Sequence, residues 1–151
     1  MLNYGVPSGR IKSIHEKEVS QMTALEEARK YFADDCYATC STGCVIDEVG
    51  EKYAKCSLIL DGRHYNAVGQ VMGGVSYTLA DFAFAVAANF RQTPTVTLTS
   101  QISYLNPVKG TTLYAESRLI KDGKRNCFYE ISVTDDLGTP VALVSVTGAH
   151  L

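Results

Sequence analysis

Residues 75–90 read VSYTLADFAFAVAANF, and this stretch decides the fold. Nearly every position is apolar, so a helix formed by these residues has to be buried on most of its sides. Short segments of β-type composition lie before and after it in the chain. An antiparallel sheet that curls around the helix provides such burial. We therefore predict an α+β domain in which a curved antiparallel sheet of about six strands wraps around one long central helix.

The segments before this stretch predict a helix and a hairpin. Thr23 and Glu26 have the spacing of a capping box, which predicts a first helix from about residue 22 to about residue 36. Two β-type runs, at 44–49 and 53–60, flank a turn around Gly50, and residues 61–71 are expected to form a loop. Gly73 then opens the long helix, which is expected to end near Phe90.

Four further β-type segments follow the helix, at 95–104, 111–121, 126–134 and 141–149. The turn signals between them include Asp122-Gly123 and residues 135–140. Since no repeat or linker interrupts the pattern, residues 23–151 are predicted to form a single domain. Residues 1–22 mix polar, charged, glycine and proline residues without a clear period, and we expect them to be a loosely ordered leader.

The composition is that of an ordinary globular domain. The 151 residues are 46% hydrophobic and 20% charged, with a formal net charge of -2. This charge argues against a nucleic-acid partner held by phosphate neutralisation. The sequence shows no apolar signal segment and no stretch suited to crossing a membrane, so the cytoplasm is the expected location.

The five cysteines leave two interpretations open. Cys36, Cys40 and Cys44 are four residues apart and could share one face of a helix, which is a spacing that a metal cluster could use. The alternative is that they are reduced and serve as small core residues. We favour the second interpretation and predict no bound metal.

Asp81 is the ionisable residue of the apolar stretch. A buried, unpaired carboxylate is costly, so its pKa shifts or it finds a partner. It could be held by hydrogen bonds or face solvent at a subunit boundary. It could also be a catalytic carboxylate in a cleft, which is the hypothesis that we favour because desolvated carboxylates are common in active sites.

Two stretches carry a resemblance to a known family. Residues 64–81 read HYNAVGQVMGGVSYTLAD, and residues 103–117 read SYLNPVKGTTLYAES. They resemble the PaaI-like (phenylacetate-pathway) hotdog-fold acyl-CoA thioesterases, whose pattern has an Asn three residues before a Gly, a His-Gly-Gly, a Leu-Ala-Asp, and then an aromatic residue, a Pro and a Gly. The resemblance implies a hotdog fold and the hydrolysis of a coenzyme A thioester without a further cofactor.

The resemblance also implies roles for individual residues. Asp81 matches the family's catalytic carboxylate, which acts as general base for water or as nucleophile. Asn66 matches the residue that positions the water or the carbonyl group, and the Gly73 amide matches the donor to the thioester oxygen. Thr97 falls where some relatives hold the attacking water. Gly74 belongs to the same implied site as a substrate-binding residue.

Met72 departs from the family pattern, which has a histidine at this position. Methionine cannot donate a hydrogen bond, so the change could lower the rate or widen the pocket, although the Gly73 amide would remain. A second hypothesis is therefore a hotdog protein that binds an acyl ligand as sensor or carrier without turnover. A purely structural oligomer would leave Asp81 unexplained.

The spacing of Gly73 and Asp81 predicts a site shared by two subunits. The two residues are eight positions apart, or about 12 Å along a helix. Reacting atoms have to come within roughly 3 to 4 Å, so one helix cannot bring both groups to one bond. Two antiparallel helices can, which predicts a homodimer. The resemblance further suggests a homotetramer.

Two lesser signals concern substrate binding. His64 precedes the asparagine motif and could touch the substrate, but a loop histidine is more often solvated or structural, which is the interpretation that we favour. Arg118, Lys124 and Arg125 belong to the densest basic cluster, around the turn at Gly123. They could hold the phosphates of coenzyme A, or they could be solvated charges of a hairpin turn.

Overall fold

The computed structural model describes residues 22–151, so the predicted leader lies outside the described residues except for Met22. The described chain forms a six-stranded antiparallel sheet in the order β1-β2-β4-β5-β6-β3. The strands are β1 (Val45–Gly50), β2 (Tyr53–Ile59), β3 (Thr95–Tyr104), β4 (Thr112–Asp122), β5 (Asn126–Asp135) and β6 (Pro140–His150). Each predicted strand is present, with bounds that agree to within one residue.

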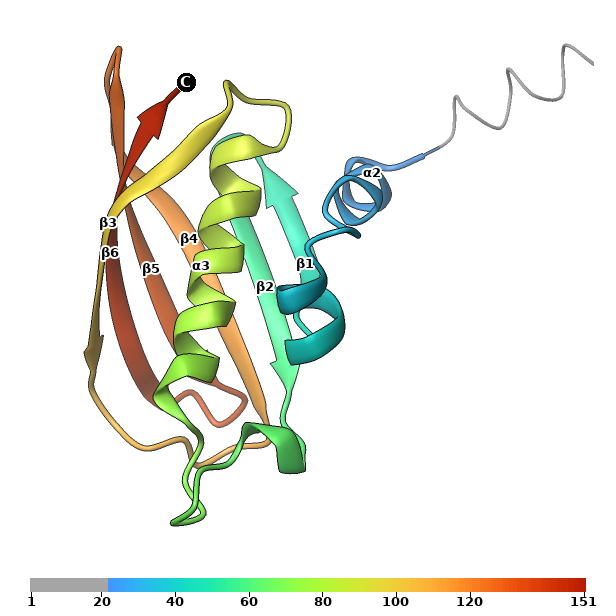
Figure 1. Ribbon diagram of the computed structural model, residues 1–151, viewed down its shortest axis with the longest axis vertical. Helices are drawn as coiled ribbons and strands as arrows, with labels where there is room; N and C mark the ends of the chain where they lie inside the picture. Colours follow the sequence, from blue (N-terminus) through green and yellow to red (C-terminus); the bar gives the residue numbers. More distant parts are fainter. Residues whose placement is uncertain (1–21) are drawn as a thin grey trace, which may run out of the picture.

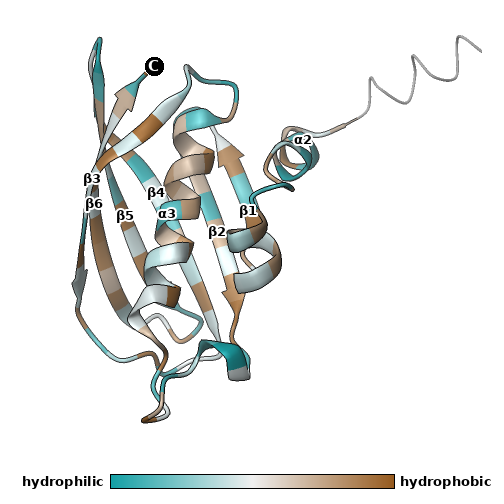
Figure 2. Ribbon diagram, in the orientation of Figure 1, coloured by the Kyte–Doolittle hydropathy of each residue, from teal (hydrophilic) through white to brown (hydrophobic). Residues whose placement is uncertain are grey.

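Helix α3 (Gly73–Asn89) lies across the concave face of the sheet (Figure 1). It contacts every strand, and Leu79, Ala83, Phe84 and Val86 are almost fully buried. Buried and exposed positions alternate along β2, β4 and β5, and Figure 2 shows the matching bands of hydrophobic and hydrophilic residues. The predicted curved sheet around one long helix is confirmed.

One stripe of α3 stays uncovered by the described chain. Tyr77, Asp81 and Ala85 follow one another at four-residue spacing, and Asp81 is exposed while the other two are half-buried. The helix is therefore buried on most of its sides, as predicted, and open along this one stripe. The reason is that the sheet curls around one side only, so the opposite side is open in a single chain (Figure 1).

The first helix is shorter than predicted. Helix α2 is Ala24–Tyr31 and begins with the predicted capping box between Thr23 and Glu26. After Tyr31 the chain turns, and Phe32 packs edge-on against Phe82 of α3. A short π-helix, η1 (Tyr37–Thr42), follows, which the sequence did not predict.

Strand β3 is an edge strand, with β6 as its neighbour within the described part of the chain. Most of its residues are exposed, and a bulge interrupts the pairing between Thr97 and Thr99. Its outer edge therefore presents backbone N–H and C=O groups that no described strand pairs.

Candidate active site

The first turn of α3 presents backbone N–H groups without partners among residues 22–151. Met72 precedes the helix in an extended conformation (φ -65°, ψ 133°), and its amide donates to the His64 carbonyl oxygen at 2.9 Å. The Val75 amide donates to the Met72 carbonyl oxygen, whereas the Gly73 and Gly74 amides meet no acceptor in this part of the chain. Such a helix start favours an anion or a developing oxyanion.

Two side chains cross this helix start above the glycines. A Cβ atom at Gly73 would lie 2.7 Å from the Tyr104 hydroxyl oxygen, and one at Gly74 would lie 2.7 Å from the Met72 methyl carbon. Both distances are too short for a real contact. The two glycines therefore allow Tyr104 and Met72 to approach the helix backbone closely.

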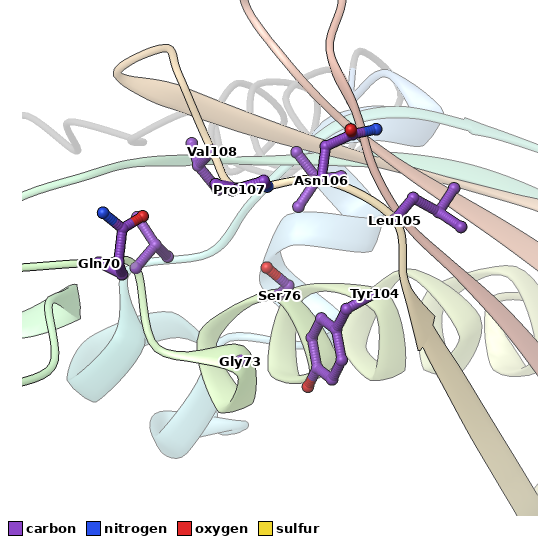
Figure 3. A pocket seen from close by; sticks show the side chains of 10 residues that line it. Gln70, Gly73, Ser76, Tyr104, Leu105, Asn106, Pro107 and Val108 are labelled. Carbon is purple, nitrogen blue, oxygen red and sulfur yellow. The ribbon is translucent and has the colours of Figure 1, made fainter.

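A hollow of about 400 Å³ opens beside Gly73 (Figure 3). Its walls come from the loop before α3, the first turn of α3 and the segment after β3. Gln70, Ser76, Tyr104 and Pro107 are among the residues that line it. A carbonyl group on the Gly73 amide would have room beside it for the rest of an acyl chain.

Asn66 folds the loop that leads into α3. Its side-chain oxygen accepts hydrogen bonds from the Val68 amide at 3.1 Å and the Gln70 amide at 3.0 Å. Gly69 closes this turn with φ +76°. The Asn66 side-chain nitrogen has no partner within residues 22–151, so it is free to donate a hydrogen bond.

Asp81 lines a second hollow, of about 320 Å³, between α3 and the segment around η1. Asp35, Cys36 and Tyr37 form the opposite wall. The carboxylate reaches solvent, but the surrounding walls exclude enough water that burial raises its pKa, and the nearby charge of Asp35 raises it further. A carboxylate with a raised pKa is suited to accept a proton from water.

A single chain does not bring Gly73 and Asp81 together. They lie eight residues apart on α3, about 12 Å along its axis, and each lines a different hollow. The two groups could act on one bond only if a second chain supplied one of them.

Thr97 faces the α3 side of the sheet. It pairs with Gly148 of β6, and a Cβ atom added at Gly148 would lie 3.0 Å from the ring of Phe84 on α3. Gly148 therefore points toward the helix, and Thr97 points the same way because paired residues share a face of the sheet. Its side chain is exposed because β3 is the edge strand. The structure thus places Thr97 on the face that carries α3, beside the unpaired edge.

His64 is a structural residue of the loop before α3. It is 2% exposed, its Nδ1 accepts a hydrogen bond from the Asp61 amide at 2.9 Å, and its Nε2 lies 2.9 Å from the Thr42 carbonyl oxygen. Both ring nitrogens are therefore occupied within the chain, with Nε2 as the donor. This arrangement favours the structural alternative over substrate contact.

The structure separates the predicted basic cluster. Arg118 forms an ion pair with Glu116 and stacks over the Tyr53 ring, on the face of the sheet away from α3. Lys124 and Arg125 are exposed in the β4–β5 turn, at the end of the sheet where α3 finishes (Figure 1). These two side chains remain available to a phosphate, and Arg118 is already paired.

Cys36 and Cys40 are exposed and Cys44 is buried, and the described residues hold no group of three His, Cys, Asp or Glu side chains arranged to bind a metal ion. Within the same residues, no helix combines the length and the apolar character needed to span a bilayer.

Sequence reasoning missed two features of the site. Tyr104 was noted as part of the family pattern, but its position above Gly73 depends on the path of β3 past the helix start. Ser76 was not predicted as a site residue because it lies in an apolar stretch. It stands one helical turn after Gly73, and this spacing could have indicated that both residues share one face of the helix.

Comparisons with known proteins agree with the fold and identify the family. The sequence profile of the Thioesterase superfamily matches residues 68–142. A protein named "Putative esterase" from Archaeoglobus fulgidus is 30% identical over 103 residues, which are 68% of this chain and 67% of that protein. The acyl-coenzyme A thioesterase PaaI of Escherichia coli is 28% identical over 121 residues, or 80% of this chain and 86% of that enzyme.

A solved structure supports the same fold and family. A variant of the phenylacetic acid degradation protein PaaI from Thermus thermophilus superposes with a TM-score of 0.70 at 27% sequence identity, over 75% of this chain and 97% of that one. The resemblance seen in the sequence is thereby confirmed. The chain belongs to the thioesterase superfamily, and its sheet and central helix are the hotdog fold of PaaI-like proteins.

Proposed function

We propose that the protein hydrolyses an acyl-CoA thioester to the free acid and coenzyme A. The observation that carries this proposal is the unpaired Gly73 amide at the start of a long helix, which also bears Asp81 with its raised pKa. The PaaI enzyme of Escherichia coli, which the chain resembles over most of its length, is named for the same reaction.

In the proposed reaction, the thioester oxygen accepts a hydrogen bond from the Gly73 amide. Asp81 takes a proton from water while the water oxygen attacks the carbonyl carbon. The tetrahedral intermediate then expels the coenzyme A thiolate, which is protonated, and the acid is released. Thr97 and the Asn66 side-chain nitrogen orient the water or the carbonyl group. No metal or other cofactor takes part.

The proposed site needs two chains. The uncovered stripe of α3 bears Asp81, and an antiparallel partner helix on this stripe would bring its own Gly73 opposite. Strand β3 is an edge strand whose last residue, Tyr104, reaches Gly73 of α3, so a second copy of β3 could continue the sheet where two such helices pack together.

A tetramer is supported by the outer face of the sheet. Ile120 and Phe128 are 65% and 41% exposed and border one hollow of about 670 Å³. Large exposed apolar side chains of this kind mark a contact surface. We propose that two dimers meet there.

The β4–β5 turn suits the phosphates of coenzyme A. Lys124 and Arg125 lie at the far end of α3 from Gly73 in their own chain, and antiparallel packing turns this end toward the partner's Gly73 side. The thioester would sit on the partner's Gly73, and the long pantetheine arm would span the remaining distance to the phosphates at Lys124 and Arg125.

The test is thiol release from short, medium and aromatic acyl-CoAs. Asp81→Asn should lower kcat/KM at least about a hundredfold. Asp34→Asn, which removes an exposed carboxylate outside the hollow, is the matched control and should stay close to the wild-type value. Equal activity of Asp81→Asn and Asp34→Asn would contradict the proposed mechanism.

Met72 favours the second candidate, an acyl-CoA-binding protein that lacks turnover. Its side chain is half-exposed at the helix start and carries no donor. Binding of acyl-CoA without turnover of any thioester, together with activity gained in Met72→His, would establish this alternative. The cytoplasm is the expected compartment in either case.

A further inference from the structure

Ser76 is a nearly buried serine that lines the hollow beside Gly73. The residue is 2% exposed, its oxygen has no hydrogen-bond partner within residues 22–151, and the hydroxyl is not fully enclosed because it opens into the hollow. Thr78, two residues further on, satisfies its own hydroxyl by donating to the Gly74 carbonyl oxygen at 2.8 Å. Ser76 lacks this solution, so its hydroxyl has to find a partner in the space that it lines.

That space is the hollow beside Gly73. Figure 3 shows the Ser76 oxygen pointing away from α3 into the hollow. Val71, Leu105, Pro107 and Val141 supply apolar walls. Asn106, another polar residue of the lining, already donates from its side-chain nitrogen to the Pro140 carbonyl oxygen at 2.8 Å. The Ser76 hydroxyl is therefore a polar group on a nearly buried residue, in a hollow whose lining is largely apolar.

Ser76 and Gly73 are one helical turn apart, about 4.5 Å along the axis. Both line the same hollow. An acyl group whose carbonyl oxygen sits on the Gly73 amide would therefore run past the Ser76 hydroxyl within its first few atoms.

We propose that this hollow is the acyl subsite and that Ser76 selects acyl groups with a hydroxyl or keto oxygen close to the thioester carbonyl. The inference rests on the proposed thioesterase function. A serine hydroxyl accepts from a substrate hydroxyl and donates to a keto oxygen, so it serves both groups. A saturated chain would cover the Ser76 hydroxyl without pairing it, which disfavours that substrate.

The experiment compares kcat/KM for hexanoyl-CoA with that for 3-hydroxyhexanoyl-CoA and 3-ketohexanoyl-CoA. The wild-type protein is expected to prefer the oxygenated substrates by about tenfold, the worth of one hydrogen bond. Ser76→Ala should reduce this ratio to within about twofold. Thr78→Val, which removes a helix hydroxyl that is already bonded, should keep the wild-type ratio.

A wild-type protein without the preference, or a Ser76→Ala variant that retains it, would overturn the role of Ser76. Absence of turnover with every thioester would instead reject the proposed function. In that case calorimetry measures the binding affinities of the same three acyl-CoAs for the wild type and for Ser76→Ala. The ratio of the affinity for the oxygenated acyl-CoAs to that for hexanoyl-CoA then decides the role of Ser76.

Discussion

Asp35 and Asp81 line one hollow, and the charge of Asp35 adds to the burial that raises the pKa of the Asp81 carboxyl. The proposed base is active when it is deprotonated, so its raised pKa moves the acidic limb of activity to higher pH. Asp35→Asn removes a neighbouring negative charge and therefore lowers the pKa of Asp81. The acidic limb of the kcat/KM profile is expected to shift to lower pH. A limb at the wild-type position would show that another group controls it.

The Gly73 amide can be removed with little change to the backbone. Met72 is extended, as a residue before proline prefers, and proline is favoured at the first position of a helix. Tyr104 would obstruct the new side chain, so the variant is Gly73→Pro combined with Tyr104→Ala, and Tyr104→Ala alone is its reference. The pair should differ in kcat by about a hundredfold or more, because one oxyanion donor is lost. Thermal unfolding of both proteins checks that the helix is intact.

Complementation tests whether one site uses two chains. The Gly73→Pro/Tyr104→Ala chain and the Asp81→Asn chain are each expected to be nearly inactive. In a mixed dimer, one site combines the intact Gly73 of one chain with the intact Asp81 of the other. Random mixing of unfolded chains, followed by refolding, should restore about a quarter of the wild-type activity. Mixing without any gain would contradict a site built from the Gly73 of one chain and the Asp81 of the other.

Asp135 stabilises the segment that forms one wall of the Gly73 hollow. Its carboxylate accepts hydrogen bonds from the amides of Lys109 at 2.9 Å, Gly110 at 3.0 Å, Leu137 at 3.0 Å and Thr139 at 2.8 Å. Burial opposes the charge, yet these bonds prevail and lower its pKa from 3.8 to about 2. The stabilisation is complete above the unfolded-state pKa and is lost as the pH falls through about 2.

Asp135→Asn should accordingly lower the free energy of unfolding by about 2 kcal/mol at pH 7. The difference between wild type and variant should shrink as the pH is lowered from about 4 toward about 2. Urea unfolding across this range measures both quantities. A difference that is constant with pH would mean that the charge of Asp135 does not matter.

The sequence was sufficient for the fold because its elements are local. The strand bounds follow from alternation and turn residues, and the capping box at Thr23 starts the first helix as predicted. The end of that helix was wrong, because Phe32 packs against Phe82, which lies far along the chain. The exposure of Asp81 was one of the alternatives that the sequence left open, since composition shows that a helix is apolar but not how far a sheet curls around it.

Some features of the site also follow from the local sequence, whereas others depend on contacts between distant segments. The unpaired Gly73 amide follows from its position at a helix start, which the glycines mark in the sequence. The occupied nitrogens of His64 and the pairing of Arg118 with Glu116 depend on contacts between distant segments. The same holds for the open position of the Ser76 hydroxyl.

The unpaired edge of β3 has a consequence for assays in dilute solution. Its last residue, Tyr104, lies against Gly73, so the strand that would recruit a second chain ends at a group that would act on substrate. If association completes the site, the specific activity should fall as the enzyme is diluted below the dissociation constant of the dimer, while the chain keeps its secondary structure. Rates measured at nanomolar protein would then report assembly as much as chemistry.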